Sequence, residues 1–485
     1  MKLYPKITKE IDRSAAGSRT VAFFDLDGTL ISGFSITSLL RERISSYHLG
    51  LLDAAEELFD LANHAIVGRN FPTLLDHAVA TLRGIAEQDF IELGNAVFEK
   101  YTAADIYPES RALVKAHLDR GHTVVILSSA TIYQVKPIAE ELGIDNILCN
   151  QLVVKDGVFT GEVEKPLCYA EGKLFAAEDF VAERSLSLDD CFFYSDGFED
   201  LPLMEAVGFP RPLNPDFRLG EAARERGWPV RKFSSRGLPG FKEVLRTGLA
   251  YGAFMSAAVS IVPTWILNRS RRDAVNLAVT TWGEFGSALA GIKIHVKGEE
   301  NLWAKRPAVF LFNHQSAADV LIISNLLRRD FTAIAKKEIA GNPLVGPVFR
   351  VADAVFIDRR NHEKAIEALK PVVDSLHEGL SLAIAPEGTR SPGNRLGPFK
   401  KGPFHIAMQA GVPVVPIVIH NATDVLPKGA FFLRPAEVFV EVLPPIATDG
   451  WVAADIGKHA EEVRQSYLQI LGQGAPRSTA LRSVG

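Results

Sequence analysis

The sequence predicts two α/β domains in tandem, each built on a largely parallel sheet that helices cover. At 485 residues the chain is too long for a single hydrophobic core, so its length alone predicts two to four domains. In both halves, short apolar runs alternate with stretches of helical periodicity, which is the pattern of parallel strands joined by crossover helices. Polar residues directly follow several of these runs, and in doubly wound sheets ligands bind at that position.

The composition is typical of a globular protein, with 47% hydrophobic and 23% charged residues. The net charge of -5 gives no global attraction to nucleic acid, so we expect no nucleic-acid partner. The three cysteines, Cys149, Cys168 and Cys191, form no Cys-x-x-Cys pair and predict neither a zinc site nor a disulfide scaffold. Residues 1–6 have no apolar core behind their charges, so we expect no signal peptide and active sites that face a reducing cytoplasm.

The first half of the chain, over residues 19–233, predicts one doubly wound domain with a helical insertion. The expected strands are the apolar runs 21–24, 123–127, 191–194 and, last, 230–233. Residues 36–101 show helical spacing and few β-branched runs, which predicts a helical insertion after the first strand. Residues 234–240 are rich in serine, glycine and proline and are expected to form a linker.

An uncharged segment at residues 249–267 is long enough to span a bilayer. Basic residues flank it on both sides, which opposes a single span under the positive-inside tendency; they are Lys242, Arg246, Arg269, Arg271 and Arg272. With residues 274–289 the segment therefore predicts a pair of helices that lies in one leaflet, within a membrane-associated region at 241–290. The alternative is a buried helix of a soluble domain.

The second half predicts another α/β domain, over residues 291–472, followed by a flexible tail at 473–485. Helical stretches such as 362–380 separate several of its strands. The expected strands are 292–296, 308–312, 354–357, 382–385, 414–419 and 438–442.

The first group of functional residues suits phosphoryl transfer, which needs a nucleophile, a proton donor for the leaving oxygen and a cation near the phosphate. Asp25 follows the first strand and would be the nucleophile, while Asp27 points the same way from the adjacent turn and can shuttle a proton. Ser128, at the end of the second strand, would bind a phosphate oxygen, and Lys173 would balance the negative charge.

A magnesium site is expected at the same edge of the sheet. Asp196 and Asp200 follow the third strand, and carboxylate oxygens are the ligands that Mg²⁺ prefers. With Asp25 and Asp27 they form the expected set of metal ligands. Any one of these residues alone would favour an ordinary structural role, such as capping a loop, but their order at successive strand ends favours a shared site.

These residues, in this order, resemble the haloacid dehalogenase superfamily of phosphatases, and the resemblance covers residues 19–233. The insertion at 36–101 is similar to the cap of the phosphoserine-phosphatase-like branch. The resemblance implies a Rossmann-like domain in which Asp25 is phosphorylated and Asp27 acts as general acid and base. Phosphoserine phosphatases recognise the substrate ammonium with an acidic residue nine positions after the nucleophile. Here that residue is Phe34, so a more apolar phosphate ester competes with phosphoserine as the expected substrate.

The second group of functional residues suits transfer to a hydroxyl group. His314 follows an apolar strand, and Asp319 lies five positions later, at the start of a predicted helix. Asp319 can accept a hydrogen bond from one imidazole nitrogen and leave the other as a base. Arg359 adds a cation at another strand end. A tight polar turn suited to a phosphate or glycerol headgroup follows a further strand and contains Glu387, Gly388 and Arg390.

A fourth block, the Val-Pro-Val-Val-Pro run at 412–416, precedes another strand. Together these four blocks resemble the glycerolipid acyltransferases, specifically the 1-acylglycerol-3-phosphate acyltransferases, over residues 242–471. The resemblance implies that His314 activates the sn-2 hydroxyl for attack on an acyl thioester of coenzyme A or acyl carrier protein. It also implies that Arg359, Glu387 and Gly388 bind the acceptor. Because no nucleophilic Ser or Cys block is present, we expect direct transfer without an acyl-enzyme.

The sequence therefore predicts a bifunctional phospholipid-biosynthesis enzyme, peripheral or monotopic on the cytoplasmic face of the cell membrane. It would form phosphatidic acid in one half and hydrolyse a phosphate monoester with Mg²⁺ in the other. Two alternatives remain for the first half, a phosphoserine phosphatase and a regulatory module. A non-catalytic membrane tether is the competing interpretation of the second half.

Overall fold

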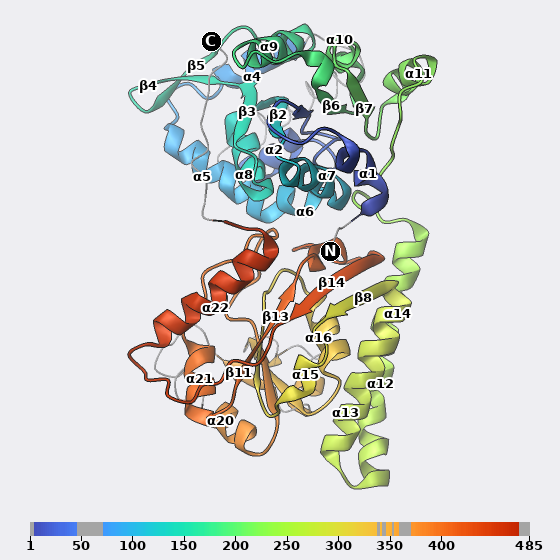
Figure 1. Cartoon of the computed structure of the whole chain (residues 1–485), viewed down its shortest axis with the longest axis vertical. Helices are drawn as coiled ribbons and strands as arrows, with labels where there is room; N and C mark the ends of the chain where they lie inside the picture. Colours follow the sequence, from blue (N-terminus) through green and yellow to red (C-terminus); the bar gives the residue numbers. More distant parts are fainter. Residues whose placement is uncertain are drawn as a thin grey trace. The chain divides into compact units, whose positions relative to one another are not determined.

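The computed structural model describes residues 4–45, 71–336, 340–341, 346–351, 354–357 and 370–474. The chain divides into two compact units between Leu238 and Pro239. Figure 1 shows that each unit has its own sheet with helices packed on it.

The first unit is built on a five-stranded, all-parallel sheet with the strand order β3-β2-β1-β6-β7 (Figure 1). Its strands are β1 (Val21–Phe24), β2 (Thr123–Thr131), β3 (Asn146–Asn150), β6 (Phe192–Ser195) and β7 (Phe209–Pro212). All four residues of β1 are buried, Ala22 and Phe24 in one hydrophobic cluster, Val21 and Phe23 in another. Successive side chains of a strand point to opposite faces, so both faces of this sheet are covered. The predicted doubly wound fold is confirmed.

Helices surround this sheet, and a two-stranded hairpin follows β3. The helices are α1 (Pro5–Arg13), α2 (Ser35–Ser45), α4 (Phe71–Ala80), α5 (Glu87–Val97), α6 (Ala103–Asp105), α7 (Pro108–Asp119), α8 (Ile132–Leu142), α9 (Glu171–Ala182), α10 (Leu201–Ala206) and α11 (Phe217–Glu225). The hairpin pairs β4 (Leu152–Lys155) with β5 (Val158–Val163). The predicted insertion at 36–101 is mostly helical where the structure describes it, except at residues 81–86, which form a turn and a bridge from Ala86 to Val158. Its residues 46–70 lie outside the described part.

The edge of the first sheet differs from the sequence prediction. The predicted last strand at 230–233 is wrong, because only Arg231 forms a bridge, to Leu213. The edge strand is β7, whose sequence Phe-Pro-Arg-Pro is typical of a turn. Edge strands tolerate proline because one side of the strand forms no ladder, which explains how two prolines fit here. The strands β3, β4 and β5 were also not predicted.

The second unit has a seven-stranded sheet with the order β11-β10-β12-β9-β13-β14-β8. All neighbours are parallel except β13 and β14. The strands are β8 (Ile292–Lys297), β9 (Val309–Phe312), β10 (Phe331–Lys336), β11 (Val355–Ile357), β12 (Ser381–Ile384), β13 (Val414–Ile419) and β14 (Ala436–Val442). Six of these match predicted strands. The prediction missed β10, which contains two alanines, a residue depleted in strands.

The helices of this unit that cover the sheet are α15 (Asn301–Ala304), α16 (Asp319–Leu327), α18 (Gly346–Val351), α20 (Lys370–His377), α21 (Gly402–Ala410) and α22 (Ile456–Leu471). The predicted helix at 362–380 is described only from Lys370 onward, where α20 begins. Buried side chains on both faces of β9 pack beneath these helices, with Phe310 in one cluster and Val309 and Leu311 in another. This sheet, too, is buried on both sides.

The predicted helical pair is confirmed as a hairpin. It consists of α12 (Phe241–Asn268) and a second arm formed by α13 (Arg271–Thr281), a π-helical turn at 282–286 and α14 (Ser287–Ala290). Arg269 adopts a left-handed conformation (φ 56°) at the turn, and Ser270 caps α13 by accepting the Asp273 N–H at 3.2 Å. Among the described residues, α12 alone is long and apolar enough to cross a membrane, and 17% of its apolar window is buried. Such low burial argues against a core helix.

A buried hydrogen-bond chain links Tyr194 of β6 to the backbone of Ala15. The Tyr194 hydroxyl lies 3.0 Å from His117 Nε2, His117 Nδ1 lies 2.8 Å from His122 Nδ1, and His122 Nε2 lies 2.8 Å from the Ala15 carbonyl. A carbonyl only accepts, so His122 donates from Nε2 and accepts at Nδ1. His117 then donates from Nδ1 and accepts the Tyr194 proton at Nε2. Burial lowers the pKa of His117 and of His122, which favours the neutral form of both rings.

This series of buried hydrogen bonds predicts that the first unit loses stability in mild acid. An unfolded histidine has a pKa of about 6.5. Both histidines have a lower pKa in the folded protein, so the unfolded state binds more protons once the pH falls below about 6.5. The unit therefore loses stability as the pH falls from about 6.5 toward the pKa values of the folded protein. Urea titrations at about pH 7.5 and 5.5 test this, with thiol labelling as the readout, since all three cysteines of the chain are buried in this unit. The double variant His117→Gln/His122→Gln should be less stable at the higher pH and less sensitive to acid. Equal acid sensitivity of the two proteins would contradict the prediction.

Candidate active sites

The first candidate site lies at the carboxyl ends of β1 and β6. Gly28 forms the turn after β1 with φ 69°, and a Cβ there would lie 1.9 Å from the Asp196 carboxylate. Glycine is therefore required for Asp196 to approach this loop. Thr29 Oγ1 donates to Asp196 Oδ1 at 3.3 Å. The structure thus brings the predicted strand-end carboxylates Asp25 and Asp196 together.

The ammonium of Lys173 is the positive centre of this site. Its Nζ donates to Asp25 Oδ1 at 2.9 Å and to Asp200 Oδ2 at 2.8 Å, and its side chain is 2% exposed. Burial disfavours the ammonium, but the charges of Asp200 and Asp25 outweigh it and raise the pKa of Lys173. Ser195 Oγ also donates to Asp200, at 2.6 Å. Removing one partner of such a buried pair typically costs about 3–5 kcal/mol, so Lys173 is needed for stability as well as for charge balance.

Asp27 is held away from Lys173 by Ser35. Asp27 accepts the Ser35 N–H at 2.7 Å and the Ser35 hydroxyl at 3.2 Å, and Gln134 donates to the same hydroxyl at 2.9 Å. Burial raises the pKa of Asp27 to about 6, in spite of these hydrogen bonds. A carboxyl group that titrates near neutral pH suits general acid and base chemistry. The sequence analysis missed the positioning roles of Ser35 and Gln134, which are ordinary polar residues with no motif.

The carboxylates of this site fit a divalent cation only in part. Burial raises the pKa of Asp25 to about 7, and burial with repulsion from Asp25 raises the pKa of Asp196 to about 9. Asp200 Oδ1 is buried without a hydrogen-bond partner in the described structure. However, the Asp27 carboxylate is bonded to Ser35, and no three His, Cys, Asp or Glu side chains in the described ranges form a metal cluster. Asp25, Asp196 and Asp200 are therefore the side chains that would hold Mg²⁺, and the ligand role of Asp27 stays a prediction.

Two further predicted residues border this site. Ser128 lies in β2, two residues past the Ile126 that pairs with Phe24, so it reaches the same edge of the sheet as Asp25. Its hydroxyl is buried and accepts the Ala130 N–H at 3.1 Å. Phe34 is 63% exposed and directly precedes Ser35.

The second candidate site lies where β9 meets α16. His314 Nδ1 lies 2.8 Å from Asp319 Oδ2, and the same oxygen accepts the N–H groups of Gln315 and Ser316, each at 2.9 Å. Asp319 is fully buried at the first residue of α16, where the helix dipole favours a negative charge. The Asp319 carboxylate accepts a hydrogen bond from the Nδ1–H of His314, which leaves Nε2 as an acceptor. The predicted base and its orienting residue are therefore in contact.

Asn313 fixes the backbone beside this histidine, a role that the sequence analysis missed. Its side chain accepts the Ile419 N–H at 2.7 Å and donates to the Ile419 carbonyl at 2.8 Å, so it continues the ladder to β13 beyond the end of β9. A fully buried asparagine directly after an apolar strand is the signal that would have indicated this role.

Glu387 is directed into the protein. One carboxylate oxygen accepts the His314 backbone N–H at 2.7 Å, and the other accepts the Ser391 hydroxyl at 2.8 Å and the Gly397 N–H at 3.0 Å. Burial raises the pKa of Glu387, although these donors oppose the shift. The carboxylate therefore ties the His314 loop to its own turn. This geometry favours a positioning role over the acceptor-binding role that the resemblance implied.

The other predicted acceptor-binding residues differ in their surroundings. Gly388 has φ 74°, and the Lys400 side chain packs where a Cβ would lie, 2.9 Å from Cε. Arg390 is half-buried and has no hydrogen-bond or ion-pair partner among the described residues, so it is available to an anionic ligand. Arg359 lies outside the described residues.

Comparisons with known proteins identify both units as enzyme domains. Residues 22–205 match the sequence model of the haloacid dehalogenase-like hydrolase family, and residues 293–420 match that of the acyltransferase family. The chain is 36% identical over 232 residues to a 1-acyl-sn-glycerol-3-phosphate acyltransferase from Limnanthes alba, covering 48% of this chain and 80% of the relative.

Two bacterial relatives match about half of the chain. The inhibition of morphological differentiation protein of Streptomyces azureus is 33% identical over 269 residues, covering 53% of this chain and 95% of the relative. A phosphoserine phosphatase of Mycobacterium tuberculosis is 29% identical over 255 residues, covering 51% and 81%. The chain therefore belongs to the 1-acyl-sn-glycerol-3-phosphate acyltransferase family and carries a haloacid dehalogenase-like hydrolase domain, as the sequence analysis predicted.

The position of Glu387 makes a prediction about kinetics. In Glu387→Gln the amide can present oxygen to only one side, so it turns an NH₂ group toward either the His314 N–H or the Ser391 and Gly397 donors. The displaced His314 should lower kcat of acyl transfer by about 10²-fold, with little change in the acceptor KM. Arg390→Gln serves as the comparison and should raise the acceptor KM. A Glu387→Gln enzyme with a raised KM and normal kcat would restore Glu387 as an acceptor-binding residue.

Proposed function

We propose that the chain is a bifunctional enzyme of phospholipid biosynthesis. The second unit transfers an acyl group from acyl-CoA or acyl carrier protein to the sn-2 hydroxyl of 1-acylglycerol-3-phosphate and so forms phosphatidic acid. The first unit hydrolyses a phosphate monoester through an aspartyl-phosphate, with Mg²⁺. The observation that carries the proposal is the contact of His314 with the buried Asp319, beside the contact of Asp25 with Lys173. A regulatory module or a tether would need neither arrangement.

The acyl transfer follows from the free Nε2 of His314. This nitrogen takes the proton of the sn-2 hydroxyl as the oxygen attacks the thioester carbonyl, and Asp319 stabilises the imidazolium that forms. The carbon–sulfur bond then breaks, and the imidazolium returns the proton to the leaving thiolate. Arg390 and Arg359 supply positive charge for the acceptor phosphate.

The phosphatase reaction uses Asp25 and Asp27 in turn. A carboxylate oxygen of Asp25 attacks phosphorus, and Asp27 gives its proton to the leaving ester oxygen. Asp27 then takes a proton from the water that attacks the phosphoryl-aspartate, which releases phosphate and restores Asp25. Lys173 opposes the effect of burial and so favours the ionised form of Asp25, and Ser128 donates to a phosphoryl oxygen. Mg²⁺, when bound, would offset the charge of the transferring group.

The substrate of the phosphatase unit is proposed to be a phosphate ester without an ammonium group. Phe34 stands where a carboxylate would pair with the ammonium of phosphoserine, and its ring is 63% exposed. Phosphoserine is the alternative, since the Mycobacterium tuberculosis relative bears that name. We further propose domain limits of 19–233, 241–290 for the helices and 291–472, with a linker at 234–240.

Crossed variants test the two activities. Asp25→Asn should abolish phosphate release from p-nitrophenyl phosphate and leave incorporation of labelled acyl-CoA into phosphatidic acid intact. His314→Ala should lower acyl incorporation by about 10²–10⁴-fold and leave phosphate release intact. Chelation of Mg²⁺ should stop phosphate release only. In each variant, the activity that the other unit retains serves as the control for an intact protein. Near-normal acyl transfer by a folded His314→Ala enzyme would show that His314 is not the general base.

The membrane proposal rests on the exposed face of α12. Val259, Val262 and Ile266 recur at helical spacing and are 69%, 55% and 72% exposed. An apolar stripe of this kind suits insertion into one leaflet, and we propose that it holds the chain on the cytoplasmic face of the membrane. Two of the flanking arginines already have partners within the protein. Arg271 donates to the Val351 carbonyl at 3.1 Å, and Arg272 pairs with Asp330 at 2.7 Å.

Replacement of the apolar stripe tests this proposal without disturbing the arginines. Val259→Asn, Val262→Asn and Ile266→Asn together should weaken sedimentation with lipid vesicles at least tenfold, because burying each side chain contributes about 1.5–3 kcal/mol. Phe217→Asn, at a 78% exposed residue of the first unit, is the control and should not change binding. Unchanged sedimentation of the triple variant would contradict membrane attachment through α12. Labelling of Lys242→Cys and Arg272→Cys on opposite sides of a bilayer would instead reject the in-plane arrangement.

A further inference from the structure

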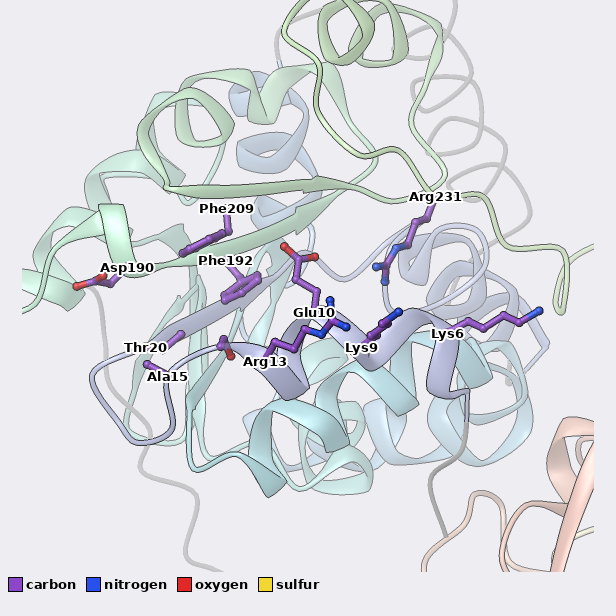
Figure 2. Close-up of a pocket in the computed structure, with 11 residues that line it drawn as sticks. Lys6, Lys9, Glu10, Arg13, Ala15, Thr20, Asp190, Phe192, Phe209 and Arg231 are labelled. Carbon is purple, nitrogen blue, oxygen red and sulfur yellow. The ribbon is translucent and has the colours of Figure 1, made fainter.

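The first unit has a pocket at the amino ends of its strands, whereas Asp25 lies at their carboxyl ends. An open pocket of ≈ 530 Å³ lies between α1 and the segments that enter β1, β6 and β7, and Figure 2 shows the residues that line it. Thr20 directly precedes β1, whereas Asp25 directly follows it, so the length of that strand separates the pocket from the nucleophile. The proposed phosphatase chemistry therefore does not use this pocket.

One wall of the pocket is cationic. Lys6, Lys9 and Arg13 line it from α1, at positions i, i+3 and i+7, which share one face of a helix. All three are exposed, and none has a hydrogen-bond or ion-pair partner in the described part of the chain. The other face of α1 is buried through Thr8 and Ile11. The helix is thus anchored by its apolar side and presents its cations to the pocket.

Contacts with the sheet side of the unit fix this helix in place. Arg231 also lines the pocket and donates to the Ile7 carbonyl at 2.6 Å. Glu10, the acid of α1 that lines the pocket, is paired with Arg211, whose Nε lies 3.0 Å from Oε2. Asp190 is the other acidic residue that lines the pocket, and it has no ion-pair partner in the described ranges. The wall therefore carries an excess of positive charge.

This excess favours an anionic ligand. Like charges three or four residues apart on a helix repel one another, so a bound anion would relieve the repulsion within the row on α1. Several cations around one pocket match the several oxygens of a phosphoryl group better than a single carboxylate. The charge and spacing thus indicate a ligand with one or more phosphates.

The other end of the pocket is aromatic. Phe192 and Phe209 stack with ring centroids 4.5 Å apart and planes 15° apart, and Phe209 is 36% exposed. Figure 2 shows these rings at the opposite end of the pocket from Lys6 and Arg231. An exposed ring that is already held in place by another ring offers a stacking surface for a flat ligand.

We propose that this pocket binds a small phosphate ester that carries a flat ring, the chemistry of a nucleoside phosphate. Its phosphoryl oxygens lie against Lys6, Lys9, Arg13 and Arg231, and its ring lies against Phe209. The site goes beyond the proposed function, because neither the acyl transfer nor the hydrolysis at Asp25 requires it.

Calorimetry on the full chain, without added Mg²⁺, tests the proposal with ADP, pyrophosphate and adenosine as probes. ADP should bind saturably and more tightly than either of its parts. Lys9→Gln with Arg13→Gln should weaken ADP and pyrophosphate at least tenfold. Phe209→Ala should weaken ADP several-fold and leave pyrophosphate unchanged. The control pair Lys155→Gln with Arg224→Gln removes the same charges from other exposed positions of the unit and should change binding less than twofold.

Three outcomes would overturn the proposal: no saturable binding of ADP, equal weakening by the test and control pairs, or undiminished binding in the test pair. Vesicles of phosphatidic acid in phosphatidylcholine form a further arm. If the test pair weakens vesicle binding but not ADP binding, the cations bind a lipid phosphate and the role of Phe209 is wrong. Normal p-nitrophenyl phosphate hydrolysis by each variant shows that the unit is folded. Because calorimetry measures neither activity, its result is independent of the proposed function.

Discussion

The ammonium of Lys173 lies between Asp25 and Asp200, and the first active site depends on this contact. The buried carboxylates of Asp25 and Asp200 converge where β1 and β6 end, and burial disfavours the charged form of Asp25. Lys173 is held by both partners and so supplies a fixed positive charge from within the fold. That charge favours the ionised form of Asp25 and opposes the upward shift of its pKa that burial causes.

The second unit solves a related problem with backbone donors. Asp319 is fully buried, and the N–H groups of Gln315 and Ser316 stabilise its charge at the start of α16. The same carboxylate then fixes the tautomer of His314. Glu387 holds the histidine from its backbone side, so two buried acids determine where one imidazole points. Both units thus place their chemistry where a buried strand ends and fix it with charges that solvent does not screen.

Much of this arrangement could be predicted because the ends of buried strands can be recognised in the sequence. Asp25 follows an uninterrupted apolar run, and His314 and Asp319 keep the spacing that a strand-to-helix turn requires. Features that depend on tertiary contacts could not be predicted. The proline-containing β7 is stable only as an edge strand, and Glu387 looks like a ligand-binding residue until its three internal donors are seen. The pocket beside α1 needs residues far apart in the sequence and has no motif.

Reductive trapping of the phosphoryl-enzyme tests the central claim most directly, since it reports on the ionised nucleophile itself. Borohydride reduces an acyl phosphate to an alcohol, so an enzyme quenched with it during hydrolysis of p-nitrophenyl phosphate is marked at the phosphorylated residue. Mass spectrometry of the digested chain should find Asp25 converted to homoserine in the wild-type protein and no conversion in Asp25→Asn. An actively hydrolysing enzyme in which Asp25 stays unmodified, or in which another carboxylate carries the mark, would contradict the account.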